Sequence, residues 1–190
     1  MSDIFIEPFQ ADDTKELARV VAVAMSTNPS HAAVFQGHGD EEVRRANDVF
    51  EILFQYSPGI SYVARREGKP VGVVRMMPSP HCLAPPPEAA RSLEPLMKEA
   101  LRDSSSRFNE WFAVWMRNDP REPHLHLGPN AVLPELQGQG IATRLLTRVC
   151  EHMDADGKAG PSSLNKFQPP SRSPPCTSTP QPLRLYLHSH

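Results

Sequence analysis

The stretch AVLPELQGQGIATRLL, residues 131–146, decides how the rest of the sequence is interpreted. It opens with apolar residues that suit a strand, Ala131 and Val132, and turns through the run 137–140, which contains two glycines. Apolar residues then recur at the three- and four-residue spacing of a helix, in a stripe that extends beyond the quoted stretch to Met153. The sequence therefore predicts a strand, a glycine turn and an amphipathic helix in succession.

A glycine turn at the start of a helix suits a phosphate group for two physical reasons. The first N–H groups of a helix lack intrahelical partners, and the helix dipole is positive at that end. Glycines also let the backbone approach a ligand closely, because they carry no Cβ. The residues alone leave two interpretations open, namely a phosphate-binding turn and a plain tight connection between strand and helix.

Two common phosphate loops fit this turn poorly. A P-loop requires a Lys after its last glycine, and none follows Gly140. A Rossmann fingerprint requires Gly or Ala at the position held by Thr143, and it follows the first strand of a βαβ unit, which is not predicted here.

The turn instead resembles the acetyl-CoA signature of the GNAT N-acetyltransferases, Q/R-x-x-G-x-G/A, because Gln137, Gly140 and Ala142 match its fixed positions. The run 131–146 resembles the fourth strand, turn and third helix of that family. The upstream order agrees: a strand at 4–9, helices from Asp13 and over 43–56, and a hairpin over 60–77. The resemblance covers roughly residues 1–160, with residues 88–118 resembling a helical insertion.

The resemblance implies an α/β fold of the α+β type, with a mixed central sheet flanked by helices and incomplete at its C-terminus. We expect a GNAT-like domain over 1–160 and a Pro/Ser-rich, disordered tail over 161–190. Within the domain, 28–40 is predicted to be a loop, and Pro95 is expected to limit a helix to starting near it.

The resemblance also implies a cofactor and its binding residues. Acetyl-CoA would be the co-substrate, with its pantetheine arm beside Val132 and Leu133 and a strand bulge at Gly128-Pro129. The acetyl group would pass directly to an amine of an unknown small-molecule or peptide acceptor. The pyrophosphate of CoA would bind the backbone N–H groups of Gln137, Gly138, Gln139, Gly140, Ile141 and Ala142.

His124 and His126 are the candidate catalytic residues, because the amine must be neutral when it attacks and a His suits a base near neutral pH. The alternative is that both are ordinary strand residues that pack and hydrogen-bond. Trp111 and Trp115, four residues apart, share a helix face and are either core or one wall of an acceptor pocket.

The tail departs from the family, which continues with a fifth strand and a fourth helix that often supplies a Tyr toward the thiolate. One hypothesis is an out-of-frame or mis-spliced segment; the other is that the alternating residues 183–187 form the fifth strand after an inserted loop. If the fifth strand is missing, the fourth is an exposed edge and we expect oligomerisation through it. The alternative function is a truncated, non-catalytic CoA-binding remnant.

Composition excludes other classes. The chain has 190 residues and a formal net charge of −2, so neither nucleic acid nor membrane is expected as a partner. Without a basic, apolar leader or a long apolar run, a cytoplasmic location is predicted. Three cysteines, Cys82, Cys150 and Cys176, lack CxxC spacing, which argues against a disulfide framework or a zinc site, and no metal is expected.

Overall fold

A computed structural model describes residues 3–57, 59–83, 85–122, 124–158 and 185–186. Its strands form one sheet in the order β1-β2-β3-β4-β5, antiparallel except for the parallel pair β4–β5. The sheet is therefore mixed, as predicted. The strands are β1 (Ile4–Pro8), β2 (Ile60–Arg66), β3 (Lys69–Pro78), β4 (Leu125–Val132) and β5 (Leu185–Tyr186). The α-helices are α1 (Thr14–Met25), α2 (Pro29–Phe35), α3 (Asp40–Tyr56), α4 (Pro87–Leu101), α5 (Ser105–Asn118) and α6 (Ile141–Lys158).

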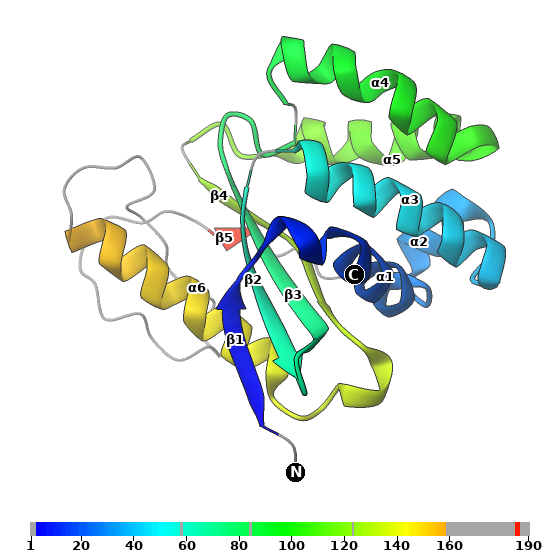
Figure 1. Cartoon of the computed structure of the whole chain (residues 1–190). Helices are drawn as coiled ribbons and strands as arrows, with labels where there is room; N and C mark the ends of the chain where they lie inside the picture. Colours follow the sequence, from blue (N-terminus) through cyan, green and yellow to red (C-terminus); the bar gives the residue numbers. More distant parts are fainter. Residues whose placement is uncertain (1–2, 58, 84, 123, 159–184, 187–190) are drawn as a thin grey trace.

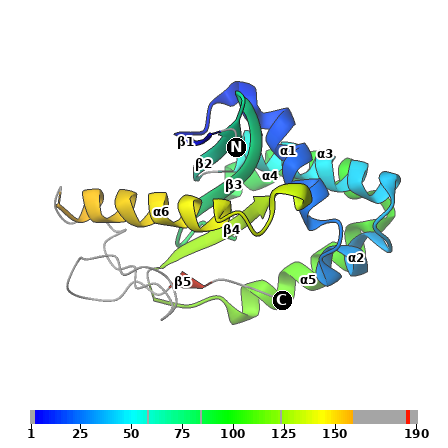
Figure 2. The same ribbon diagram turned by 90° about the horizontal axis from the view of Figure 1, so that it is seen from below.

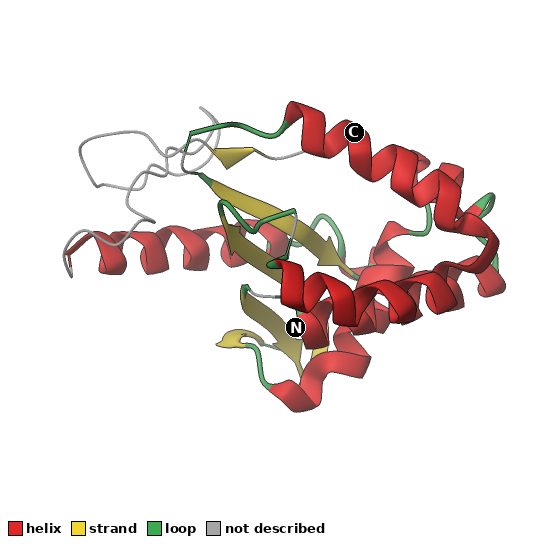
Figure 3. Ribbon diagram, turned by 90° about the horizontal axis from the view of Figure 1, so that it is seen from above, coloured by secondary structure: helices red, strands yellow, loops and turns green. Residues whose placement is uncertain are grey.

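Helices cover both faces of the sheet, as the predicted fold class requires. Figure 1 shows α6 on one face and the other helices on the opposite face, and Figure 3 shows the same division from above. Alternate side chains of each strand supply the two cores. On β2, Tyr62 joins the core under α6, whereas its neighbour Val63 joins the core under α1 and α3. On the α6 side, Leu145 and Val149 are fully buried.

Two local predictions are wrong, and each has a physical reason. Residues 28–40 are not all loop, because α2 occupies part of them: Pro29 starts this helix, and Asn28 Oδ1 accepts a hydrogen bond of 2.9 Å from Ser30 N–H. Helix α4 starts at Pro87 and continues through Pro95. Pro95 is exposed, so water can satisfy the carbonyl that its missing N–H leaves free.

The predicted bulge in β4 is confirmed. Val74 pairs with Asn130 and Met76 pairs with Leu127, so Gly128 and Pro129 together lie opposite a single residue of β3. A strand carrying Pro at this point loses a ladder hydrogen bond, and the extra residue accommodates that loss.

Beyond the bulge, the start of β4 has a neighbour on its outer side. Leu185 pairs with Leu125 and Tyr186 with His126, in parallel. Figure 2 shows β5 close to one end of β4. This agrees with the hypothesis that 183–187 supplies a fifth strand. Residues 159–184 lie outside the described part of the chain, so the predicted disordered tail stays a prediction, as does oligomerisation through the rest of the β4 edge.

The cysteines of the described residues differ in state. Cys82 is a free, buried thiol, whereas Cys150 on α6 is disulfide-bonded. The sequence argues against a disulfide framework, and a single disulfide at Cys150 is compatible with that expectation. Among the described helices, none combines the length and the apolar character needed to cross a membrane.

Candidate functional site

The predicted glycine turn lies between the end of β4 and the start of α6. A short 3₁₀ helix, Pro134–Leu136, leads from the strand into the turn, and α6 begins at Ile141. Gly138 and Gly140 both have positive φ, of 76° and 77°. Other residues rarely adopt this conformation, so these two glycines are required by the backbone itself. A Cβ placed on either would meet no atom within 4 Å, so the turn faces open space.

The turn presents backbone donors to that open space. The first hydrogen bond of α6 runs from Arg144 N–H to Gly140 O at 3.1 Å, which leaves the N–H groups of Ile141, Ala142 and Thr143 without intrahelical partners. Residues 137–140, Ala142 and Thr143 are exposed, whereas Ile141 is buried and anchors the first turn of the helix. The dipole of the 18-residue helix makes this end positive. The arrangement can hold an anionic group by backbone hydrogen bonds.

A side chain ties the turn to the strand that precedes it. Gln137 Nε2 donates to Val132 O at 3.0 Å, while Leu133 N–H donates to Val71 O on β3 at the same distance. Val132 and Leu133 are buried, and both belong to the core under α6. The six predicted turn residues and the two predicted strand residues are thus brought together, in one continuous segment whose geometry is set by β3, β4 and α6.

Comparison with known proteins decides the family. The model of the acetyltransferase (GNAT) family matches residues 27–164, more than half of the chain and including the whole turn. The chain belongs to the GNAT acetyltransferase family. A search of curated proteins found no match.

Solved structures of GNAT acetyltransferases share the fold. A protein from Corynebacterium glutamicum, described as histone acetyltransferase HPA2 and related acetyltransferase, superposes with a TM-score of 0.54 at 22% identity, over 80% of this chain and 72% of its own. A candidate acetyltransferase from Pyrococcus horikoshii superposes with a TM-score of 0.51 at 14% identity, over 82% of this chain and 77% of its own. At these identities the likeness shows the fold and no more.

The predicted catalytic histidines lie at the other end of β4 from the turn. His124 immediately precedes the strand and His126 is its second residue; their exposed fractions are 3% and 2%. Val132 lies six positions after His126, which corresponds to about 20 Å of extended chain. His126 also lies against Trp115, with ring centroids 5.9 Å apart. The structure therefore does not bring the histidines to the turn, and both are covered by protein.

Two residues that the sequence did not single out lie beside the histidines. Asp119 follows α5, and its Oδ1 lies 3.3 Å from His124 Nε2 and 3.6 Å from His126 Nδ1. Cys82, in the connection after β3, places its Sγ 3.4 Å from His124 Nε2. Burial raises the pKa of the Cys82 thiol to about 11, and the charge of Asp119 adds to this effect. In the sequence, only the H-x-H spacing of the two histidines indicates this cluster, because Cys82 and Asp119 are distant from each other in the sequence.

The two tryptophans pack within the helical layer. Trp111 lies against the core under α1 and α3, with its ring centroid 5.7 Å from that of His31. Trp115 lies 4.5 Å from Trp111, measured between ring centroids. These contacts support a core role for Trp111. A role for either side chain in an acceptor pocket stays a prediction.

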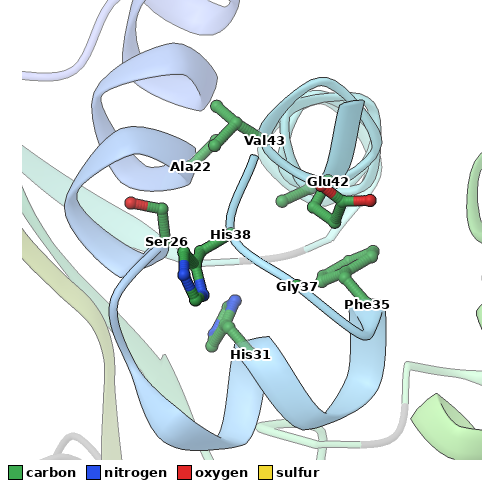
Figure 4. Close-up of a pocket in the computed structure, with 9 residues that line it drawn as sticks. Ala22, Ser26, His31, Phe35, Gly37, His38, Glu42 and Val43 are labelled. Atoms are coloured by element: carbon green, nitrogen blue, oxygen red, sulfur yellow. The ribbon is translucent and has the colours of Figure 1, made fainter. Parts of the chain in front are cut away.

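A small hollow lies between α1, α2 and the start of α3 (Figure 4). His31 on α2 and His38 in the following loop line it, together with Glu42 and the apolar Phe35. Burial lowers the pKa of His31 to about 4, so this imidazole is neutral at physiological pH. The hollow lies on the helical side of the molecule, and β4 and the glycine turn do not line it.

Proposed function

We propose that this chain transfers an acetyl group from acetyl-CoA to an amine of a small-molecule or peptide acceptor, directly and within a ternary complex. Membership of the GNAT family supports the reaction class. The acceptor is defined here only by the chemistry that the reaction requires, which is a nucleophilic nitrogen.

The observation that carries the proposal is the exposed glycine turn at the start of α6. A pyrophosphate carries negative charge and accepts hydrogen bonds, and the segment Gln137–Ala142 offers free backbone donors at the positive end of a long helix. In the proposed complex the pyrophosphate binds there. The pantetheine arm then extends along β4 past Leu133 and Val132 toward the bulge at Gly128-Pro129.

Direct transfer requires that the acceptor amine lose its proton before or during attack on the thioester carbonyl. The nitrogen lone pair forms the new amide bond, the carbon–sulfur bond breaks, and CoA leaves as the thiolate. His124 and His126 remain the predicted bases. Because both are buried, this role would require the proton to reach them through ordered water or through a rearrangement of Trp115.

The proposal is tested with the full chain in two steps. The first is a thermal melt with and without acetyl-CoA, because a ligand that binds only the folded state stabilises it by about 2.7 kcal/mol at a hundredfold excess over its Kd. The second is release of free CoA thiol in the presence of a panel of primary amines, with desulfo-CoA as a control that binds the turn but cannot carry an acetyl group.

Stabilisation together with amine-dependent thiol release is the expected result. Stabilisation without release for any amine would favour the alternative, a non-catalytic CoA-binding remnant. A cooperative melt that acetyl-CoA does not shift would contradict the proposed cofactor site.

A further inference from the structure

Four side chains with the chemistry of metal ligands meet where the helical insertion joins the sheet. Cys82, Asp119, His124 and His126 each direct one donor atom to a common centre, and all four atoms lie within 4.8 Å of one another. They come from three separate segments: the connection between β3 and α4, the residue after α5, and the start of β4. We propose that this cluster is a structural site for a divalent transition metal of the zinc type.

The spacing of the donor atoms fits a tetrahedral ion. Zinc bonds of about 2.0 Å to nitrogen or oxygen and about 2.3 Å to sulfur place tetrahedral donors roughly 3.3–3.8 Å apart. The separation of His124 Nε2 is 3.4 Å from Cys82 Sγ and 3.3 Å from Asp119 Oδ1. His126 Nδ1 lies 3.6 Å from the same carboxylate oxygen. All three distances agree with the spacing expected between the donor atoms of a tetrahedral site.

The hydrogen bonding of His124 directs the correct nitrogen to the centre. Its Nδ1 lies 2.9 Å from the backbone oxygen of Glu122, which can only accept, so this nitrogen carries the hydrogen. In the neutral ring, Nε2 then has a lone pair, and it faces both the thiol and a carboxylate oxygen. A carbonyl bonded to the remote ring nitrogen is the usual second partner of a metal-bound histidine.

One carboxylate oxygen at the centre has no hydrogen-bond donor. Asp119 Oδ1 is buried without a hydrogen-bond partner, and imidazole nitrogens of His124 and His126 lie 3.3 and 3.6 Å from it. A carboxylate oxygen facing an imidazole lone pair is unfavourable unless a positive charge lies between them. A bound divalent ion supplies that charge and satisfies all four donors at once. The mixed set of two imidazoles, a thiolate and a carboxylate is one that zinc accepts.

The position of the cluster indicates what the ion would do. Cys82 and Asp119 are 37 residues apart and flank the insertion formed by α4 and α5. Both would be joined to β4 through the histidines, which closes a long loop at its base. Ser79 already fixes this corner, since its N–H donates to His124 O and its Oγ accepts from His124 N–H, each at 3.0 Å. Four protein ligands leave no open position, so the site is structural rather than catalytic.

The proposal excludes a base role for the same histidines, because a lone pair bound to a metal cannot take up a proton. With the metal bound, the proposed acetyl transfer would need a base other than these two histidines, whereas the proposed cofactor site at the glycine turn is unaffected. The test of the metal site needs no acetylation assay. The proposal also replaces the expectation from the sequence that no metal is bound, which was based on the lack of CxxC spacing.

The test uses the full chain without an affinity tag, purified and then titrated with Zn²⁺ or Co²⁺ alone. We expect about one tightly bound ion per chain by elemental analysis, in keeping with a single four-ligand site. Co²⁺ should give the visible bands of tetrahedral cobalt together with a near-ultraviolet thiolate-to-cobalt charge-transfer band. Cys82→Ser should abolish the charge-transfer band, and it should weaken zinc binding by more than the roughly 10- to 100-fold that loss of an outer partner costs.

His81→Gln is the matched control, because His81 is exposed and adjacent to Cys82 but does not belong to the cluster. It should bind zinc and cobalt like the unmodified chain. If Cys82→Ser does not fold, Asp119→Asn provides a second test, in which the thiolate band persists while affinity falls. Substoichiometric metal, a cobalt spectrum without thiolate character, or a loss that follows His81 rather than Cys82 would each overturn the proposal.

Discussion

The glycine turn and the cluster of four donors lie at opposite ends of the same strand, and they are built in opposite ways. The turn is one continuous segment, exposed, and dependent on backbone atoms. The cluster is buried, depends on side chains, and is assembled from residues as far apart as Cys82 and His126. The comparison shows why one could be predicted from the sequence and the other could not. A backbone site is defined by local geometry, whereas a side-chain site requires the whole fold.

The largest expected effect tests whether α6, which begins at the turn, is held by the core beneath it. Leu145 is fully buried in the core under α6, and Leu145→Ala should lower the free energy of unfolding by about 2–5 kcal/mol, through lost burial and the cavity that remains. The matched control is Leu146→Ala, because Leu146 is only partly buried and should cost about 1 kcal/mol. Urea unfolding measures both. Equal losses would show that the helix is not held by the predicted face.

A second test concerns a buried imidazole outside the cluster, that of His31. His31 has a folded pKa of about 4 because of burial, against about 6.5 when unfolded, and this difference corresponds to about 3 kcal/mol. The unfolded chain takes up the proton first, so stability is complete above about pH 6.5 and falls as the pH decreases toward 4. His31→Phe keeps the ring stacked on Phe50 and removes this loss.

Urea unfolding at about pH 7 and about pH 4.5 gives the measurement. The unmodified chain should lose about 2–3 kcal/mol more than His31→Phe between these two values. Glu42 and His38 line the same hollow and are present in both proteins, so the difference isolates His31. An equal loss in both would show that His31 is not the source of the acid sensitivity.

The smallest expected effect concerns the side chain that ties the turn to β4. Gln137→Ala removes the hydrogen bond of 3.0 Å to Val132 O and should cost about 1 kcal/mol of stability. Gln139→Ala is its control, because the Gln139 side chain is exposed and its contact with Glu135 O is long, at 3.5 Å. In thermal melts, Gln137→Ala should have a lower melting temperature than Gln139→Ala. Equal melting temperatures would mean that the hydrogen bond from Gln137 to Val132 O does not stabilise the protein.

The sequence predicted those parts of the fold whose signals are local. The periodicity of Ile141, Leu145 and Val149 indicated α6, and Gly128-Pro129 indicated the bulge that the pairing of β3 and β4 confirms. Helix α2 was missed although Asn28-Pro29 is a capping signal, because its seven residues are too few to show a clear stripe. Such local signals were present in the sequence and were outweighed by the polar composition around them.

The remaining features depend on contacts between distant residues. Nothing near Cys82 indicates that Asp119 lies beside it, because the insertion between them must fold before the two meet. Likewise, the pairing of Tyr186 with His126 joins residues on either side of α6 and the segment after it. The alternation of 183–187 allowed a strand to be considered, but its parallel pairing with β4 is set by the sheet.

The most direct test of the central claim, that the glycine turn binds acetyl-CoA, is a calorimetric titration of acetyl-CoA into a matched pair of glycine variants. Gly140 and Gly68 both have a φ of 77° and open space where a Cβ would be, so alanine should cost each about 1 kcal/mol of stability. Gly68 lies in the β2–β3 turn, outside the segment Gln137–Ala142. We predict that Gly68→Ala binds acetyl-CoA like the unmodified chain, while Gly140→Ala binds about tenfold more weakly or worse. The added Cβ and the unfavourable positive φ displace the backbone donors of the turn, and one charge-assisted hydrogen bond lost in this way costs about 1.5–3 kcal/mol. Equal affinity for all three proteins, or equal loss in both variants, would contradict the assignment.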